Sequence, residues 1–162
     1  MAIEVGERLP EATLLKRAGD DYVPVSLPDY LAGRKVAIFA LPGAYTGTCS
    51  TVHLPSFIRV ADGLRARGVD EIICISVNDP FVLNAWGDET GASAAGITML
   101  ADSDASFTKA LGMAFTFAAK GFFDRSNRYA LIADDGVVSV AMIDEPGVCD
   151  VTKGEQLLEA LG

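Results

Sequence analysis

The stretch KVAIFALPGAYTGTCS, residues 35–50, decides the fold of this 162-residue chain. Its first part, Lys35 to Leu41, is a nearly continuous apolar run rich in strand-forming residues, which is typical of a central strand covered on both faces. The run stops at Pro42-Gly43, and from Cys49 to Arg67 apolar residues recur at spacings of three and four. This periodicity predicts an amphipathic helix, kinked at Pro55.

The next elements continue the alternation of strand and helix. Glu71 to Val77 has the composition of a second buried strand. After it, Asp79 is placed to cap a helix whose first residue is Pro80, a position that proline favours. The side chains of this helix that we expect to face the core are Phe81, Val82, Ala85 and Trp86.

The C-terminal half adds strands that pair locally. Asp134-Asp135-Gly136 is a strong hairpin signal, because Asp-Gly supplies the positive φ angles that tight turns require. The other elements expected are a strand over Ile97–Leu100, a helix capped by Ser103 or Asp104 and ending at Leu111, strands over Arg128–Ala133 and Val137–Ile143, and a helix over Thr152–Leu161. This order predicts an α/β protein with a thioredoxin-like fold, in which a mixed central sheet carries helices on both faces and an N-terminal extension. With no repeat or composition shift, residues 1–162 are expected to form a single domain.

Charge and hydropathy exclude several classes of partner. The 13 basic and 22 acidic residues give a net charge of −9, which repels nucleic acid and anionic membranes alike. Every apolar run ends before the length of about 20 residues that a membrane span needs. Residues 1–15 show neither a signal peptide nor a basic transit peptide, so we predict a cytoplasmic protein unless processing removed a leader.

The three cysteines are Cys49, Cys74 and Cys149, which lie far apart and form no CxxC pair. With one histidine in the chain, a structural zinc site is not expected, and no other metal or cofactor is predicted. Scattered cysteines in a reducing compartment are usually inert core residues, but such a set can include a reactive thiol.

Cys49 occupies the position where a reactive thiol is expected. It lies where a central strand ends and the longest helix begins, a location that ligand sites favour in α/β folds. In the first turn of a helix, unpaired backbone N–H groups and the positive end of the dipole stabilise a thiolate. We therefore expect the pKa of the Cys49 thiol to be depressed.

The chain resembles the peroxiredoxins, whose motif Pro-x-x-x-Thr/Ser-x-x-Cys is matched by Pro42, Thr46 and Cys49. Within that family it is most similar to the type II, or peroxiredoxin-5, subfamily, and the similarity covers most of the chain. The segments that carry it are Lys35 to Ser50, His53-Leu54-Pro55, Ser76 to Phe81, Ala85-Trp86, Arg125 to Ala130 and Asp134-Asp135-Gly136.

The resemblance implies a role for each matching residue. Cys49 corresponds to the peroxidatic cysteine, Thr46 to the hydroxyl that orients the peroxide, Pro42 to the residue that shields the pocket, and Arg128 to the active-site arginine, with Arg125 as a neighbouring competitor. A guanidinium beside a thiolate would lower its pKa further and donate hydrogen bonds to the peroxide oxygens.

The implied activity is thiol-dependent reduction of hydrogen peroxide and alkyl hydroperoxides through a sulfenic acid on Cys49. Glutaredoxin, thioredoxin or glutathione is the expected reductant, and the subfamily commonly forms homodimers. Two cysteines are candidates for the internal resolving thiol. Cys74 lies 25 residues after Cys49, a spacing that resembles plant type II enzymes, and Cys149 lies near the position of the animal resolving cysteine. Resolution by an external thiol is the third possibility.

Gly47 departs from the subfamily, which usually has proline at this position. Because glycine is less restrained in φ, we expect the first helical turn to unwind more readily here. His53 follows Cys49 by four residues and so shares its helix face. That spacing invites a Cys–His nucleophile pair, but a histidine on the helix surface or behind the site is the simpler interpretation.

Other functions are compatible with parts of this pattern. A peroxide sensor would use oxidised Cys49 as a signal without turnover. A thiol–disulfide oxidoreductase shares the fold and the cysteine at the helix start, but the expected CxxC pair is absent. A cysteine hydrolase would need a third group to orient His53, and none is evident. Catalytic rather than stoichiometric peroxide consumption separates the enzyme from the sensor.

Overall fold

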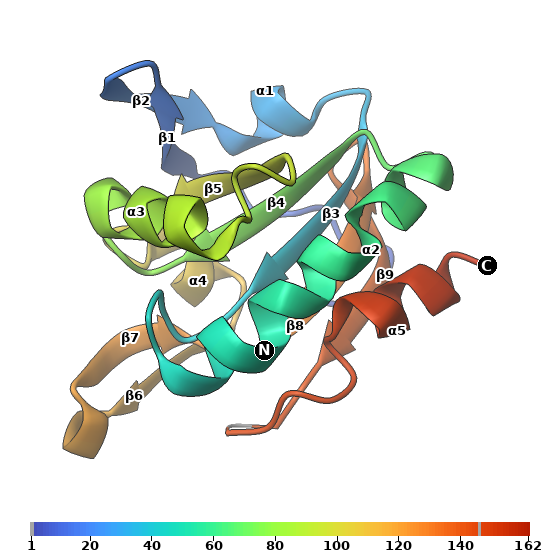
Figure 1. Cartoon of the computed structure of the whole chain (residues 1–162). Helices are drawn as coiled ribbons and strands as arrows, with labels where there is room; N and C mark the ends of the chain where they lie inside the picture. Colours follow the sequence, from blue (N-terminus) through green and yellow to red (C-terminus); the bar gives the residue numbers. More distant parts are fainter. Residues whose placement is uncertain (1, 146) are drawn as a thin grey trace.

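A mixed β-sheet forms the centre of the protein (Figure 1). The computed structural model describes residues 2–145 and 147–162, and for Cys49 the backbone. Over these residues seven strands pair in the order β2-β1-β5-β4-β3-β8-β9, and β3, β4 and β5 are parallel. Their bounds are Thr13–Ala18 (β1), Asp21–Ser26 (β2), Lys35–Ala40 (β3), Glu71–Ser76 (β4), Ile97–Ala101 (β5), Tyr129–Asp134 (β8) and Val137–Ile143 (β9). The predicted mixed, thioredoxin-like sheet is confirmed.

Helices cover both faces of the sheet, as predicted. One face carries α2 (Leu54–Ala66), α3 (Pro80–Thr90) and α5 (Gly154–Ala160), and Figure 1 shows α2 and α5 side by side. The other face carries the shorter α1 (Leu27–Leu31) and α4 (Ser106–Ala110). Alternate residues of β3 enter the two cores, Phe39 on the α2 face and Ile38 on the other, because successive side chains of a strand point to opposite faces.

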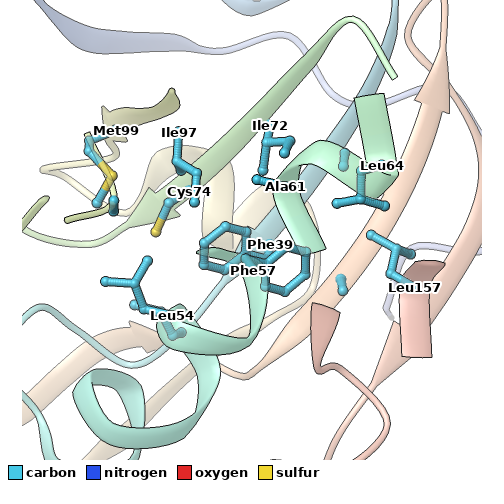
Figure 2. Packing of buried hydrophobic residues seen from close by; sticks show 14 of the residues in the cluster. Phe39, Leu54, Phe57, Ala61, Leu64, Ile72, Cys74, Ile97, Met99 and Leu157 are labelled. Carbon is cyan, nitrogen blue, oxygen red and sulfur yellow. The ribbon is translucent and has the colours of Figure 1, made fainter. Parts of the chain in front are cut away.

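The core beneath α2 is shown in Figure 2. Phe39 of β3 stacks on Phe57 of α2, with ring centroids 4.0 Å apart and an angle of 5° between the ring planes. Both side chains are fully buried. Burial of each aromatic ring stabilises the fold by roughly 1.5–3 kcal/mol, so this pair fixes the helix that follows Cys49 on the sheet.

The N-terminal extension is a hairpin. β1 and β2 pair along their whole length, and β1 also pairs antiparallel with β5. The extension therefore adds two strands to one edge of the central sheet. Pro24 lies in the outermost strand, where the missing N–H breaks no ladder within the sheet.

The hairpin predicted at Asp134-Asp135-Gly136 is confirmed. Asp135 and Gly136 join β8 to β9 as a two-residue turn, with φ angles of 50° and 78°. Asp135 tolerates the left-handed conformation, and glycine adopts it without steric cost. The Asp135 carboxylate also accepts a hydrogen bond from the Gly33 backbone N–H at 2.7 Å.

The segment after Leu111, where no strand or helix was predicted, contains a second small sheet. β6 (Ala114–Phe117) and β7 (Phe122–Ser126) pair antiparallel around the short helix η2 (Ala118–Lys120). Figure 1 shows this hairpin projecting from the body of the molecule near the start of α2. Most of its residues are exposed or half-buried, so it lacks the buried apolar run that identifies a core strand.

The predicted capping of α3 is confirmed, but its predicted inner face is wrong. The Asp79 carboxylate accepts a hydrogen bond from Val82 N–H, and Pro80 begins the helix. Of the four residues expected inside, Trp86 is buried, whereas Phe81, Val82 and Ala85 are exposed. Leu83, Asn84 and Gly87 take their places.

Two local contacts explain this rotation of α3. The Asn84 side-chain amide donates to the Pro80 carbonyl at 2.8 Å, so its burial leaves that N–H satisfied. Gly87 permits close packing on β5, since a Cβ atom there would lie 2.9 Å from Cγ of Met99. Within the part of the chain that is described, no helix has the length and apolarity to cross a bilayer.

Candidate active site

Cys49 begins a widened helical turn. Residues 47 and 48 are already helical, and η1, a π-helical turn over Cys49–His53, leads into α2. Pro55 lies in the first turn of α2 and has no N–H to donate to the carbonyl of Thr51. The kink predicted at Pro55 therefore takes the form of a π turn directly before it, a feature that often marks functional sites. The side chain of Cys49 lies outside what the structure describes.

The loop between β3 and Cys49 is held by hydrogen bonds at Ala44 and Thr46. Thr46 Oγ1 donates to the Gly43 carbonyl at 2.7 Å, and the Thr46 carbonyl accepts from Ser50 N–H at 3.0 Å. Ala44 N–H donates to Oδ1 of Asn78 at 3.0 Å, which ties the loop to the end of β4. Thr46 is thus fixed in front of the turn that begins with Cys49.

This arrangement assigns a direction to the Thr46 hydroxyl. Its single proton is donated to the Gly43 carbonyl, so Oγ1 keeps only lone pairs for a ligand. Toward the cavity it can accept a hydrogen bond but not donate one. A terminal O–H group is the complementary ligand chemistry.

Arg128 is a buried cation without a carboxylate partner among the described residues. The side chain is 6% exposed, and its Nε has no hydrogen-bond partner in the described part of the chain. Its side-chain contact is Nη1 to Nδ1 of His53 at 3.4 Å. Burying an unpaired guanidinium is costly, so this group is suited to receive an anion or a strongly polar ligand.

Arg125 supports the loop from the other side. Its Nη1 donates to the Pro42 carbonyl at 2.9 Å, and its guanidinium lies 5.5 Å from the centre of the Phe122 ring. Gly43 is required for this contact, because a Cβ atom there would lie 2.2 Å from Arg125 Nη1. The two arginines therefore have separate positions, with Arg128 lining the cavity and Arg125 bound to the loop backbone.

A cavity of about 540 Å³ brings the predicted residues together. Pro42, Thr46 and Arg128 lie on its wall, with Gly47 and Thr48 from the start of the helix. The β6–β7 hairpin also lines the cavity, through Phe115, Phe117 and Phe122 and through Lys120. The cavity lining thus combines hydrogen-bonding groups with aromatic side chains that the sequence pattern did not predict as part of the site.

The single tryptophan secures the turn that carries Cys49. Trp86 is 1% exposed, and its Nε1–H donates to Oγ of Ser50 at 2.9 Å. A buried indole N–H normally needs such a partner, so the bond links the core of α3 to the residue after Cys49.

His53 is fully buried, so the interpretation of a surface histidine is wrong. Its Nε2 lies 3.0 Å from the Thr152 carbonyl, and its ring has edge contacts with Phe39 and Phe57. Burial, and after it the nearby Arg128, lower the pKa of His53 to about 3, so the imidazole is neutral near pH 7. The histidine lies behind Arg128.

The two candidate resolving cysteines occupy different environments. Cys74 is fully buried on β4, and Figure 2 shows it among Leu54, Phe39 and Met99 in the core. Cys149 is half-buried in the loop between β9 and α5, whose Gly147 borders the cavity. Burial raises the pKa of the Cys149 thiol, although Arg128 and Thr152 act in the opposite direction.

Asp144, which sequence reasoning missed, holds the loop after Cys149. Its carboxylate accepts hydrogen bonds from the backbone N–H groups of Asp150, Val151 and Thr152 and from the Thr152 hydroxyl. Burial favours the neutral carboxyl, but these donors outweigh it and lower the pKa of Asp144 below its usual range. The described residues bring no three His, Cys, Asp or Glu side chains together in a way that could hold a metal ion.

Comparison with known proteins identifies relatives along nearly the whole chain. The family model described as Redoxin matches residues 4–157. "Peroxiredoxin-2E-2, chloroplastic" from Oryza sativa subsp. japonica is 45% identical over 98% of this chain and 72% of its own length. "Peroxiredoxin-2C" from the same organism is 42% identical over 98% of each chain. The crystal structure of reduced Prx3 from Vibrio vulnificus in complex with H2O2 superposes with a TM-score of 0.93, at 46% identity and 99% coverage of each chain.

These relatives correct the predicted cytoplasmic location. Two of the relatives that match 98–99% of the chain are named as chloroplastic proteins, so the prediction is wrong on this comparison. It rested on the composition of residues 1–15, and the residues that build the sheet and the site carry no information about a compartment.

Proposed function

Because the chain belongs to the redoxin family and, within it, to the peroxiredoxins, it is a peroxidase, and we propose that Cys49 supplies the thiolate that attacks the peroxide. The observation that carries this proposal is the convergence of two complementary groups beside the first turn of the helix. Thr46 offers only an acceptor, and Arg128 offers donors and a positive charge, on the wall of the same cavity.

The hydrogen-bonding groups orient the substrate. The terminal O–H of a hydroperoxide donates to Thr46 Oγ1, and the guanidinium of Arg128 donates to the peroxide oxygens. The thiolate attacks the terminal oxygen, the S–O bond forms as the O–O bond breaks, and the electron pair leaves on the second oxygen. That oxygen takes a proton and departs as water or an alcohol, while sulfur is oxidised by two electrons to a sulfenic acid. Arg128 stabilises the charge that moves onto the leaving oxygen.

A thiol donor completes the cycle. A first thiol attacks the sulfenic sulfur and releases water, giving a disulfide with Cys49. A second thiol then attacks the sulfur of the first thiol, so that these two sulfurs form a new disulfide and Cys49 is released as the thiol. We propose Cys149 rather than Cys74 as the internal resolving thiol, because its loop borders the cavity whereas Cys74 lies in the core. Glutaredoxin, thioredoxin or glutathione is the proposed external reductant.

The substrates proposed are hydrogen peroxide and alkyl hydroperoxides. The aromatic wall from β6 and β7 supports the second class, since it offers apolar area beside the polar end of the cavity. A homodimer is proposed as well, supported by Phe81, which is 68% exposed and in contact with Tyr22, and by the exposed Tyr45 next to Thr46. Sedimentation velocity of the parent and of Phe81→Ser tests this assembly.

The proposed chemistry is tested by pre-steady-state peroxide reduction. Cys49→Ser should abolish the reaction. Arg128→Lys should lower the second-order rate constant by about 10- to 100-fold, because lysine loses the planar pair of donors. Arg125→Lys is the matched control and should lose less, since lysine can still donate to the Pro42 carbonyl. An active Cys49→Ser variant, or an unaffected Arg128→Lys variant, would contradict the proposal.

Intact mass identifies the resolving thiol. After one equivalent of hydroperoxide, the disulfide mass should persist in Cys74→Ser and disappear in Cys149→Ser. A sulfenic acid that persists in the parent would indicate an external resolver instead. Multiple turnovers with a thiol donor support an enzyme, whereas oxidation that stops at one equivalent would indicate a peroxide sensor.

A further inference from the structure

A chain of contacts connects Arg128 to the backbone of the loop before α5. Arg128 Nη1 lies 3.4 Å from Nδ1 of His53, and Nε2 of the same ring lies 3.0 Å from the Thr152 carbonyl oxygen. Both side chains are buried, with exposures of 6% for Arg128 and 0% for His53. These contacts lie behind the cavity that Arg128 lines.

The carbonyl of Thr152 determines the tautomer of His53. A carbonyl oxygen only accepts hydrogen bonds, so Nε2 must carry the proton that points to it. In a neutral imidazole the other nitrogen, Nδ1, then keeps a lone pair. That lone pair faces Arg128 Nη1, which can only donate.

The surroundings keep the ring in this orientation. The Phe39 and Phe57 rings lie against it, with centroids at 5.3 Å and 5.7 Å and interplanar angles of about 60°. Apolar walls of this kind disfavour an imidazolium, particularly next to a guanidinium. A protonated ring would also present an N–H to the N–H of Arg128, so the contact requires the neutral form.

We propose that His53 is a positioning residue for Arg128, a neutral acceptor that directs the guanidinium into the cavity without neutralising its charge. This inference rests on the proposed function. A carboxylate in the same place would also hold the guanidinium, but its negative charge would compete with the thiolate and the developing alkoxide for the same cation. A neutral imidazole fixes one N–H and leaves the positive charge available for the reaction.

The loop that holds His53 is itself fixed. The Asp144 carboxylate accepts hydrogen bonds from the N–H and the hydroxyl of Thr152 at 3.1 Å and 2.6 Å. Ser56 Oγ accepts from Gly154 N–H at 2.8 Å, two residues further along. The Thr152 carbonyl is therefore held at a defined position relative to the helix that carries His53.

Two substitutions separate the two nitrogens of the ring. In His53→Asn the amide reaches the position of Nδ1, so an acceptor for Arg128 is kept and the contact with Thr152 is lost. In His53→Gln the amide reaches the position of Nε2, so the donor to Thr152 is kept and the contact with Arg128 is lost. The first variant tests positioning of the arginine, and the second tests support of the loop.

The rate constant for oxidation of Cys49 by hydrogen peroxide is measured together with the titration of its thiolate by ultraviolet absorbance. His53→Gln should lower the rate constant about tenfold and raise the pKa of the Cys49 thiol, whereas His53→Asn should stay within about threefold of the parent. In urea unfolding, His53→Asn should be less stable than His53→Gln, because His53→Asn loses the contact with Thr152. Val52→Asn, on the exposed side of the same turn, is the control and should change neither rate nor titration.

The outcomes separate this inference from the proposed function. A parent protein that consumes no peroxide overturns the proposed function itself. If the parent is active and the His53→Gln variant is equally active, only the proposed role of His53 is overturned. The same holds if His53→Gln and His53→Asn lose the same fraction of the rate constant. If the variants fail to fold, nitrogen NMR of the parent decides: His53 is the single histidine, and a proton on Nδ1 at pH 7 would overturn the inference.

Discussion

Gly43 shows how one residue without a side chain maintains the active-site loop. A Cβ atom at this position would lie 2.2 Å from Arg125 Nη1, too close for either group to remain in place. Arg125 would have to release the Pro42 carbonyl, to which it now donates at 2.9 Å. The position of Pro42, which lines the cavity, thus depends on residue 43 having no side chain.

We predict that Gly43→Ala lowers the rate constant for peroxide reduction by about tenfold, the effect of one charge-assisted hydrogen bond. Stopped-flow oxidation measures the rate, and a double-mutant cycle with Arg125→Ala identifies the cause. If Gly43→Ala acts through the arginine, it should add little in the Arg125→Ala background. Equal losses in both backgrounds would show a different origin.

At the residue scale, the sequence could predict the groups proposed to carry the chemistry but not the groups that hold them. Pro42, Thr46 and Arg128 were predicted from a motif and a resemblance, and the structure brings all three to one cavity. Their support depends on contacts between distant segments, such as His53 with Thr152. A spacing of four residues from Cys49 could place His53 on a helix face, but it could not reveal that the loop before α5 contacts that face.

At the scale of single elements, the turn at Cys49 is anchored to α3 by a hydrogen bond but begins with a glycine. Trp86 binds Ser50, whereas Gly47 opens the helical stretch with no side chain to restrain it. Nothing lies within 4 Å of a Cβ atom added at Gly47. The first turn is therefore the part of this helix that can open at least cost.

Gly47→Pro tests this difference. Proline is suited to the first turn of a helix, and by restricting the unfolded chain it should raise the free energy of unfolding by about 0.4–1 kcal/mol. It should also slow the reaction of the sulfenic acid with the resolving thiol, because the turn must open for that step. Urea unfolding and the time course of disulfide formation by mass spectrometry measure the two effects. Unchanged resolution in the more stable variant would contradict the expected role of Gly47.

The β6–β7 hairpin should determine which peroxides react well. Phe117 lines the cavity and is 49% exposed, so Phe117→Ser removes apolar contact area at little cost to folding. We predict that kcat/KM for cumene hydroperoxide falls about fivefold, in proportion to the lost apolar contact, while the value for hydrogen peroxide changes little. Phe123→Ser is the control, since Phe123 is 62% exposed and lies outside the cavity wall. An equal loss for both peroxides would argue against a role in selectivity.

Elements with strong periodicity or turn signals were predictable, and elements stabilised by tertiary contacts were not. β3, β4 and the β8–β9 hairpin follow buried apolar runs and an Asp-Gly turn. β1, β2, β6 and β7 consist mostly of exposed and half-buried residues, so they lack such a pattern. The inner face of α3 was wrong because its apolar residues lie on several sides, and the packing of Gly87 on Met99 decides its rotation.

For the whole molecule, one buried histidine links stability to pH. The pKa of His53 is lowered to about 3, first by burial and then by Arg128, whereas an unfolded chain titrates its histidine near 6.5. Between these values the unfolded state binds one more proton than the folded state. The free energy of unfolding therefore increases as the pH rises through this window and decreases as the pH falls through it.

We predict a loss of about 1.7 kcal/mol in the free energy of unfolding between pH 6.5 and 5. Urea unfolding measures it in the Cys49→Ser background, where the reactive thiol does not titrate. Since the chain has one histidine, the same experiment on Cys49→Ser with His53→Asn should show a much flatter dependence over this range. An identical slope in both proteins would show that other groups are responsible.

The hydrogen bond between Trp86 and Ser50 gives the molecule an optical reporter of its own. The chain has a single tryptophan, and that indole donates a hydrogen bond to Ser50, the residue after Cys49. When the turn opens, the indole loses its partner and meets water, so its emission should shift to longer wavelength and return when the turn closes. Each catalytic cycle could then be followed in real time by intrinsic fluorescence, with no dye attached.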